Sequence, residues 1–311
     1  MNPVLIAMAI ALGAIIIFYF ALRLQRPGRL LVFSILAIAA AMAPLLLPQE
    51  AKVTRFCVAL FSTLMVFKMW DLHVGAVQGC IPRFREFLGF VANLYYLVFR
   101  KRGLEPQPTT LRNVWQLALG LTGLFAAERL LTLMQKVDWL QYPFLLEHTL
   151  VGTGLFLLVV AELITFVAIT RLLGGYIVNA HDQPFAARTP ADFWRRYNRL
   201  IGQFLYEDFF KLLQGRRHPA RATLGVFAVS GIFHEYLFWM ATGQSPGLQL
   251  LFFMLQGCAV ALTLRVKPTG WRAVAWGTGT FAFNILSSVP FFASFHHMLP
   301  IYDNQLPLWL R

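Results

Sequence analysis

The sequence predicts an all-α polytopic membrane protein. Of its 311 residues, 58% are hydrophobic and only 13% are charged, which is about half the charged fraction of an ordinary soluble domain. Long apolar runs recur along the chain, and each is close to the length of about 20 residues that an α-helix needs to cross a bilayer. Basic residues gather in alternate loops between these runs, a bias typical of cytoplasmic loops. We therefore expect one integral-membrane domain over residues 1–311.

Eight apolar runs are predicted to be transmembrane helices. In chain order they cover residues 3–22, 30–48, 53–72, 111–133, 144–172, 222–241, 247–264 and 273–295. The first run has no basic segment before it and no small-residue cleavage site after it, so we interpret it as an anchor that stays. A ninth apolar stretch, residues 87–99, is short for a span and fits a re-entrant or interfacial helix.

Basic residues in the loops supply most of the net charge of +13. Arginine and lysine concentrate at 23–29, 83–112, 171–221 and 265–272, and the intervening loops carry few. With eight spans, this alternation predicts a multi-pass protein with both termini outside and the 173–221 loop in the cytoplasm. In a bacterium the membrane would be the inner one. Basic loops that set topology and meet anionic membrane lipids account for most of the charge, so no nucleic-acid partner is expected.

The cysteines and histidines predict no metal site. Cys57, Cys80 and Cys258 lie far apart among apolar residues, which supports neither a disulfide framework nor a zinc site. His234 is followed by glutamate, but a zinc HExxH motif needs a second histidine four residues later, where the chain has Phe238. No bound cofactor is expected either.

A cytoplasmic amphipathic helix is predicted after Thr189. Threonine can cap a helix, Pro190 suits the first helical position, and the acid Asp192 favours the helix dipole. Apolar residues then recur with helical period as far as Leu205, and basic residues fall largely on the other side. The basic side can meet lipid headgroups. Asn198, a polar amide near the apolar face, then needs a specific partner.

Ionisable residues inside the predicted spans are scarce and are candidates for function. Lys68 and Asp71 lie three residues apart and are expected to form a structural pair on one helix face. Glu128 and Arg129 point about 100° apart on a helix, so each is expected to pair elsewhere in the packing. Glu162 stands alone in the fifth span. Three histidines close to the outer surface are expected to be solvated: His148, His296 and His297.

His234 is placed differently. It lies about thirteen residues into the sixth span, which at 1.5 Å per residue is about 18 Å deep and near the centre of the bilayer. Ser230 and Gly231 predict room on that side of the helix. Two interpretations stay open from depth alone: a structural histidine hydrogen-bonded between helices, and a functional one.

Two stretches together resemble the membrane-bound O-acyltransferase family, in its wax synthase-like and sterol acyltransferase-like branch. "FWRRYNRLIGQFLYEDFF" contains Asn198, and "VSGIFHEYLFW" follows with His234 36 residues later. In that family a basic helix rich in Phe and Trp carries an asparagine or histidine, and a small-residue stretch precedes a histidine followed by glutamate. The match covers residues 190–241, and it is the pair of stretches that makes it specific.

The resemblance implies acyl transfer from a thioester, usually acyl-CoA as co-substrate, to the hydroxyl of a lipophilic alcohol, giving a wax ester, a sterol ester or similar. It implies His234 as general base and Asn198 as a hydrogen-bond donor, with Glu235 in a supporting role. No serine or cysteine stands in an evident nucleophile setting, so direct transfer is favoured. Arg195, Arg196 and Arg199 are expected to bind the phosphates of CoA, because arginine can contact a phosphate with two hydrogen bonds. Trp194 and Ser230 are the other predicted substrate-binding residues.

Two other classes of function stay open. A transporter could use His234, Glu235 and Glu162 as a proton path, although the internal repeat typical of transporters is not found. A lipid-binding or scaffold protein could share the fold without catalysis. A homo-oligomer is compatible with each of these. The acceptor is also open between a fatty alcohol, a sterol, a diacylglycerol and a polar secondary metabolite.

Overall fold

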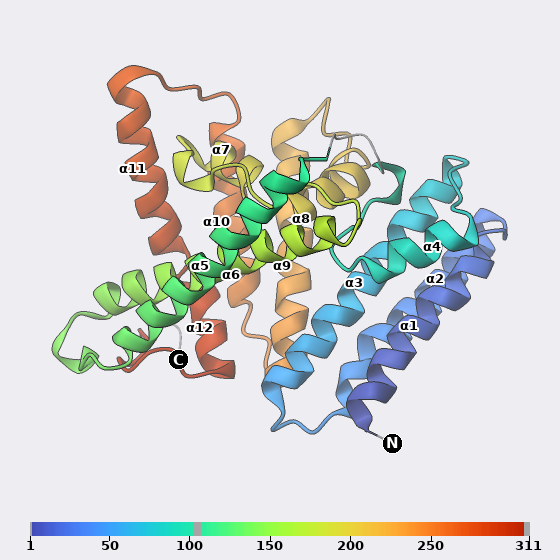
Figure 1. Cartoon of the computed structure of the whole chain (residues 1–311), viewed down its shortest axis with the longest axis horizontal. Helices are drawn as coiled ribbons and strands as arrows, with labels where there is room; N and C mark the ends of the chain where they lie inside the picture. Colours follow the sequence, from blue (N-terminus) through green and yellow to red (C-terminus); the bar gives the residue numbers. More distant parts are fainter. Residues whose placement is uncertain (1, 102–106, 308–311) are drawn as a thin grey trace.

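The computed structural model describes residues 2–101 and 107–307, and every regular element in that part of the chain is helical (Figure 1). The predicted all-α class is confirmed. In chain order the elements are α1 (Pro3–Ala21), α2 (Arg26–Met42), η1 (Ala43–Leu46), α3 (Lys52–Val77), α4 (Phe84–Ala92), η2 (Phe99–Lys101), α5 (Thr110–Met134), η3 (Trp139–Gln141), α6 (Phe144–Leu172), η4 (Pro184–Ala186), α7 (Pro190–Arg196), α8 (Arg199–Leu205), the π-helical η5 (Tyr206–Phe210), α9 (Pro219–Thr242), α10 (Leu248–Thr263), α11 (Gly270–Ser287) and α12 (Val289–Met298).

Six of the described helices are long and apolar enough to cross a membrane: α1, α2 with η1, α3, α5, α6 and α9. The predicted span at 247–264 is α10, which has only 16 residues. The predicted span at 273–295 is wrong as a single helix, because the chain divides into α11 and α12 at Ser288. Pro290 lies in the first turn of α12, where its missing N–H is tolerated, so a new helix begins there. The count of eight uninterrupted spans therefore falls to six.

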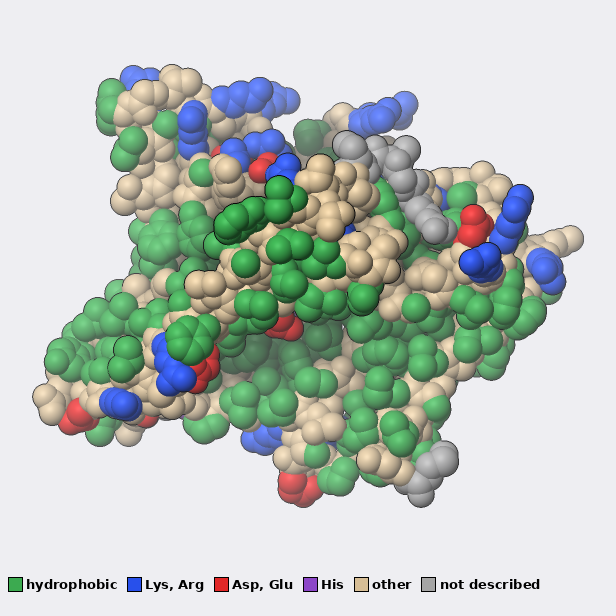
Figure 2. All heavy atoms as spheres, in the orientation of Figure 1, with side chains coloured by type: hydrophobic (Ala, Val, Ile, Leu, Met, Phe, Trp, Pro, Cys, Tyr) green, Lys and Arg blue, Asp and Glu red, His purple; other side chains and the backbone are tan. Residues whose placement is uncertain are grey.

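Helices α1, α2 and α3 pack together on one side of α9 and α10 (Figure 1). The helices α5 and α6 form a hairpin that crosses the view in front of α10 and extends to the opposite side. The start of α1 lies at the lower side of the view and α7 at the upper side. On the face in Figure 2, hydrophobic side chains fill the middle, and Lys and Arg side chains lie around the periphery, many of them along the upper edge. This distribution is typical of a membrane-embedded body.

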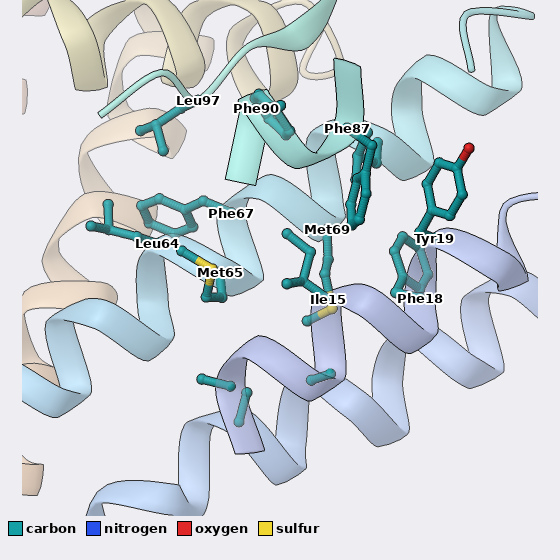
Figure 3. Packing of buried hydrophobic residues seen from close by; sticks show 14 of the residues in the cluster. Ile15, Phe18, Tyr19, Leu64, Met65, Phe67, Met69, Phe87, Phe90 and Leu97 are labelled. Carbon is teal, nitrogen blue, oxygen red and sulfur yellow. The ribbon is translucent and has the colours of Figure 1, made fainter. Parts of the chain in front are cut away.

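The largest hydrophobic core lies where α1, α3 and α4 meet (Figure 3). Ile15 and Phe18 of α1 and Met65 of α3 are completely buried there, and α4 adds Phe87. The core reaches beyond these helices, because Phe67 of α3 stacks on Phe204 of α8 with ring centroids 4.5 Å apart. The amphipathic segment predicted after Thr189 is therefore packed against the first helices of the chain.

Lys68 does not pair with Asp71 as predicted. Its ammonium group is completely buried and donates to three backbone carbonyls, those of Phe90 at 2.6 Å, Asn93 at 2.8 Å and Tyr96 at 2.7 Å. These carbonyls belong to the end of α4 and the loop after it, where a helix has no internal donors left. The predicted short apolar element at 87–99 is thus a nine-residue helix, α4, and a loop that Lys68 holds against α3.

Asp71 takes its partners from the same loop. It accepts from the backbone N–H of Phe99 at 2.8 Å and from the guanidinium of Arg100 at 3.0 Å. Arg100 also bonds Asp208 in η5, which ties η5 to α3. Burial raises the pKa of Asp208 to about 8, and the charge of Asp71 adds to the rise while Arg100 acts against it. Arg100 therefore offsets the repulsion between the two buried carboxyl groups that it links.

The predicted solvation of His148 is wrong, because that side chain is only 1% exposed. Its ring nitrogens bond the hydroxyl of Tyr302 at 2.8 Å and the carbonyl of Ile285 at 2.9 Å. His296 is also engaged, since its Nδ1 accepts from two backbone N–H groups at 3.1 and 3.3 Å. His148 thus fastens the segment after α12 to the start of α6, and His296 fastens the same segment to the end of α12. The sequence suggested solvation because both histidines lie near helix ends, but loops cover those ends in the structure.

Three other charged residues in the predicted spans, Glu128, Arg129 and Glu162, are exposed. Glu128 and Arg129 pair with each other at 3.3 Å, although separate partners were predicted, and both side chains are more than half exposed. Glu162 is exposed on α6, and no described residue makes a hydrogen bond or ion pair with it. Among the described residues, no hydrogen bond or ion pair joins any of the three to the stretch that contains His234.

Candidate active site

The predicted single amphipathic helix is in fact two short helices, α7 and α8, with a break between them. Its start is as predicted: the Thr189 hydroxyl accepts from the N–H of Asp192 at 3.1 Å, and Pro190 occupies the first position. The helix ends at Arg196, and Tyr197 is extended. The break falls at Asn198, which has the left-handed conformation with φ 45° and ψ 57°. Asparagine tolerates this region better than most residues, so the sequence permits the break.

Asn198 caps the second helix. Its Oδ1 accepts from the backbone N–H of Ile201 at 3.4 Å, which is a weak cap by length. Its backbone N–H donates to the Nδ1 of His181 at 3.2 Å. No described residue accepts from its side-chain Nδ2. The amide group is thus held by its oxygen and by the backbone, with its N–H donors left over for another partner.

His181 is a residue that the sequence did not single out. It lies in the loop between α6 and α7, with its ring stacked on Tyr197 at a centroid distance of 5.1 Å. The only signal in the sequence was its place in "NAHDQPF", shortly before the amphipathic stretch.

His234 is fixed in one tautomer by its own helix. Its Nδ1 lies 2.8 Å from the carbonyl oxygen of Ser230, and a carbonyl can only accept, so Nδ1 carries the proton. Nε2 then has a free lone pair, and no described residue donates to it. The ring packs against Phe253 of α10 at 4.4 Å and lies 6.2 Å from Phe291 of α12. An imidazole held in this way is a neutral base that is ready to accept a proton.

Glu235 points to a different partner and does not contact the imidazole. Its Oε1 accepts from the N–H of Gly247 at 2.8 Å and from the hydroxyl of Ser245 at 3.2 Å. Its Oε2 accepts from the N–H of Gln249 at 3.0 Å and, at 3.4 Å, from that of Leu250. The carboxylate therefore caps α10, where free N–H groups and the helix dipole favour a negative charge. The supporting role predicted for Glu235 is therefore not a hydrogen bond to the imidazole of His234. The observed role is to fix the end of the helix that carries Phe253.

We expect Glu235→Gln to destabilise the protein by about 1–3 kcal/mol, because an amide NH2 would face backbone N–H donors and leave them unpaired. The measurement is the thermal unfolding midpoint in detergent. Glu50→Gln is the matched control, since Glu50 is exposed. A Glu235→Gln midpoint equal to that of the wild type would show that the cap contributes nothing.

The room predicted beside Ser230 and Gly231 is filled by α10. A Cβ built on Gly231 would lie 3.0 Å from the Cα of Leu250 and 3.2 Å from the Cβ of Phe253. The small residue lets two helix backbones approach closely, as it does in other membrane helix pairs. Ser230 contributes its carbonyl to His234, and its side chain is buried.

Trp194 joins α7 to the helices around His234. Its indole N–H donates to Gln256 of α10 at 2.8 Å, and its ring meets Phe227 of α9 edge-on at 5.2 Å. It also lies 6.1 Å from Phe253, the ring that packs on His234. Trp194 and His234 thus share one aromatic neighbour, although no hydrogen bond joins Asn198 to His234.

The three predicted phosphate-binding arginines differ in their surroundings. Arg195 is largely exposed, with one bond to Asp192. Arg196 is mostly covered and donates to Asp192 at 2.9 Å and to the carbonyl of Asp182 at 3.1 Å. Burial alone would raise the pKa of Asp192, but hydrogen bonds from both arginines lower it. Arg199 begins α8 and has partners of its own. Arg195 therefore has the most freedom to meet a ligand.

A cavity of about 180 Å³ lies at the other end of the molecule, between the ends of α5 and α6 and the segment after α12. Glu147 lines it, and none of the predicted site residues does. In the described part of the chain, no group of three His, Cys, Asp or Glu side chains is arranged to hold a metal ion.

Comparisons with known proteins agree with one another. Residues 49–290 match the model of the membrane-bound O-acyltransferase family. A segment is 31% identical over 113 residues to a probable long-chain-alcohol O-fatty-acyltransferase 1 of Arabidopsis thaliana, covering 33% of each chain. Another is 32% identical over 98 residues to sterol O-acyltransferase 2 of Mus musculus, covering 30% of this chain and 18% of that one. The chain thus matches at most about a third of the length of these two relatives.

A longer match extends over most of the chain. The probable long-chain-alcohol O-fatty-acyltransferase 3 of Arabidopsis thaliana is 30% identical over 250 residues, which cover 68% of this chain and 70% of the relative.

Proposed function

This chain belongs to the membrane-bound O-acyltransferase family, and from that premise we propose that it transfers a fatty acyl group from acyl-CoA to the hydroxyl of a lipophilic alcohol. The names of its relatives support long-chain alcohols and sterols as the first acceptors to test. The observation that carries the proposal is the tautomer of His234, whose Nε2 is unprotonated and has no partner among the described residues.

The proposed reaction is direct transfer. Nε2 of His234 takes the proton of the acceptor hydroxyl as its oxygen attacks the thioester carbonyl carbon. The carbon–oxygen bond forms, the carbon–sulfur bond then breaks, and the imidazolium returns the proton to the departing CoA thiolate. The products are an ester and free CoA, so no other reactant is consumed. The free amide N–H of Asn198 would stabilise the charge that develops on the carbonyl oxygen.

The bond to Ser230 supports His234 in this role. When Nε2 takes up a proton, the imidazolium still donates from Nδ1 to the Ser230 carbonyl, so protonation does not break that contact. Glu235 is left out of the proposed chemistry, because its two oxygens serve α10. This also weakens the transporter alternative, since the carboxylate next to His234 does not bond to the imidazole.

The function is tested with purified protein in vesicles, supplied with acyl-CoA donors of several lengths and with a long-chain alcohol, a sterol and a diacylglycerol. We expect an ester to appear with at least one acceptor, together with one equivalent of free CoA. Transport of protons or solutes without ester formation from any pair would overturn the proposal and favour the transporter.

Arg195 is the residue proposed to meet the CoA phosphates, because it is exposed and lies in the basic segment before Asn198. We expect Arg195→Gln to raise the KM for acyl-CoA by about 2- to 5-fold, since an exposed ionic contact is worth up to about 1 kcal/mol. The kcat should stay close to that of the wild type. Arg272→Gln, a change at an exposed arginine of α11, is the control. An unchanged KM for acyl-CoA would instead indicate that Arg195 contacts lipid headgroups.

A further inference from the structure

The break between α7 and α8 is held from outside by residues 180–182. The Arg196 guanidinium donates to the Asp182 carbonyl, and the two segments share three further hydrogen bonds to backbone groups around the break, which a local helix signal would not produce. The donors and acceptors are Arg199 N–H to the Ala180 carbonyl at 2.7 Å, Asn198 N–H to the His181 Nδ1 at 3.2 Å, and Asp182 N–H to the Arg196 carbonyl at 2.9 Å. The middle bond is made by a side chain, and it is the one that reaches Asn198.

His181 can make this bond only as a neutral imidazole with the proton on Nε2. Nδ1 must keep its lone pair to accept from the N–H of Asn198. Burial lowers the pKa of His181 to about 4, so the ring is neutral at physiological pH. Its Nε2 is buried without a hydrogen-bond partner in the described chain. The hydrogen bond that the ring makes to the described residues is therefore the one that Nδ1 accepts from Asn198.

The conformation of Asn198 needs such support. A residue other than glycine costs free energy in the left-handed region, and such residues persist only where their surroundings fix them. The side-chain cap to Ile201, at 3.4 Å, is too long to do this alone. His181 is itself fixed, because its ring stacks on Tyr197, and Tyr197 stacks on Phe156 of α6 at 5.2 Å. Stacked rings and one hydrogen bond therefore connect the long helix α6 to the break at Asn198.

We propose that His181 is a positioning residue that holds the backbone of Asn198 so that its side-chain amide stays aimed at the reacting carbonyl. The proposal rests on the acyltransferase function given above. It assigns His181 no contact with substrate. Its loss should therefore lower kcat and leave the KM values for both substrates nearly unchanged.

Two substitutions separate the hydrogen bond from the ring. His181→Asn puts an oxygen close to the position of Nδ1, so it keeps the acceptor and loses the stacking. His181→Phe keeps a flat ring on Tyr197 and loses the acceptor. We expect His181→Asn to keep kcat within about threefold of the wild type, and His181→Phe to lower kcat by about 10- to 100-fold, which corresponds to the cost of one unpaired buried donor.

Amide hydrogen exchange of peptides that cover residues 196–202 gives a second measure that does not depend on activity. His181→Phe should exchange faster there, His181→Asn should resemble the wild type, and so should the control His218→Phe at an exposed histidine. Wild-type kcat and exchange in His181→Phe would overturn the proposal, and so would an equal loss in both variants. If the wild type forms no ester at all, the acyltransferase function fails, and exchange alone then decides whether His181 holds Asn198.

Discussion

His234→Ala is expected to lower the rate of ester formation by about 10²- to 10⁴-fold, which is the usual contribution of a positioned general base. The alanine variant loses the group that accepts the hydroxyl proton and leaves the rest of the site in place. The measurement is kcat with saturating acyl-CoA and alcohol in vesicles, with protein amounts matched by quantification of the folded fraction. Affinity for acyl-CoA should change little, because the imidazole acts on the acceptor.

The control for this variant is His218→Ala, at an exposed position in front of the same helix. It should retain full activity. The thermal midpoint of His234→Ala should stay near that of the wild type, since the bond from Nδ1 to Ser230 is a single neutral hydrogen bond, worth about 1 kcal/mol. Full ester formation by His234→Ala would exclude His234 as the base.

Lys68→Met is expected to be the most destabilising substitution away from the site. Methionine fills a similar volume, but it cannot donate to the three carbonyls that the ammonium satisfies. Each unpaired buried acceptor costs about 1–3 kcal/mol, so a total loss of about 3 kcal/mol or more is expected. The loss should appear as a lower thermal midpoint and as faster proteolysis between residues 93 and 101.

Lys211→Met is the matched control for Lys68, because Lys211 is exposed and its ionic partner in the described part of the chain is Glu207. Its midpoint should lie close to that of the wild type. If both lysine variants unfold at the same temperature, Lys68 does not hold the loop after α4, and the core shown in Figure 3 is sufficient to place it.

The sequence predicted the long helices well, because the length of an apolar run fixes a span with little help from the rest of the chain. The residues 144–172, for example, are α6 as predicted. It failed where a partner comes from elsewhere. Lys68 and Asp71 were considered on one helix, but their partners belong to the segment from Phe90 to Arg100, more than 20 residues away.

The candidate site shows the same limit. Asn198 and His234 could be found from the two stretches that contain them, and their side chains have the free groups that the proposed reaction needs. The break at Asn198 could not be predicted, because its support comes from residues 180–182 in a separate loop. Glu235 was assigned to its neighbour in sequence, but its partners are the first N–H groups of α10, twelve to fifteen residues later.

The contacts of Lys68 have a consequence for the way this protein is made. Its acceptors lie 22 to 28 residues later in the chain. At a synthesis rate of about 5–20 residues per second, about 1–6 s separate the translation of the lysine from that of its last acceptor. During that interval the translocon receives a helix with a positive charge whose partners do not yet exist. α3 must therefore stay near the aqueous side, or beside the insertion machinery, until α4 and its loop arrive to cover the ammonium.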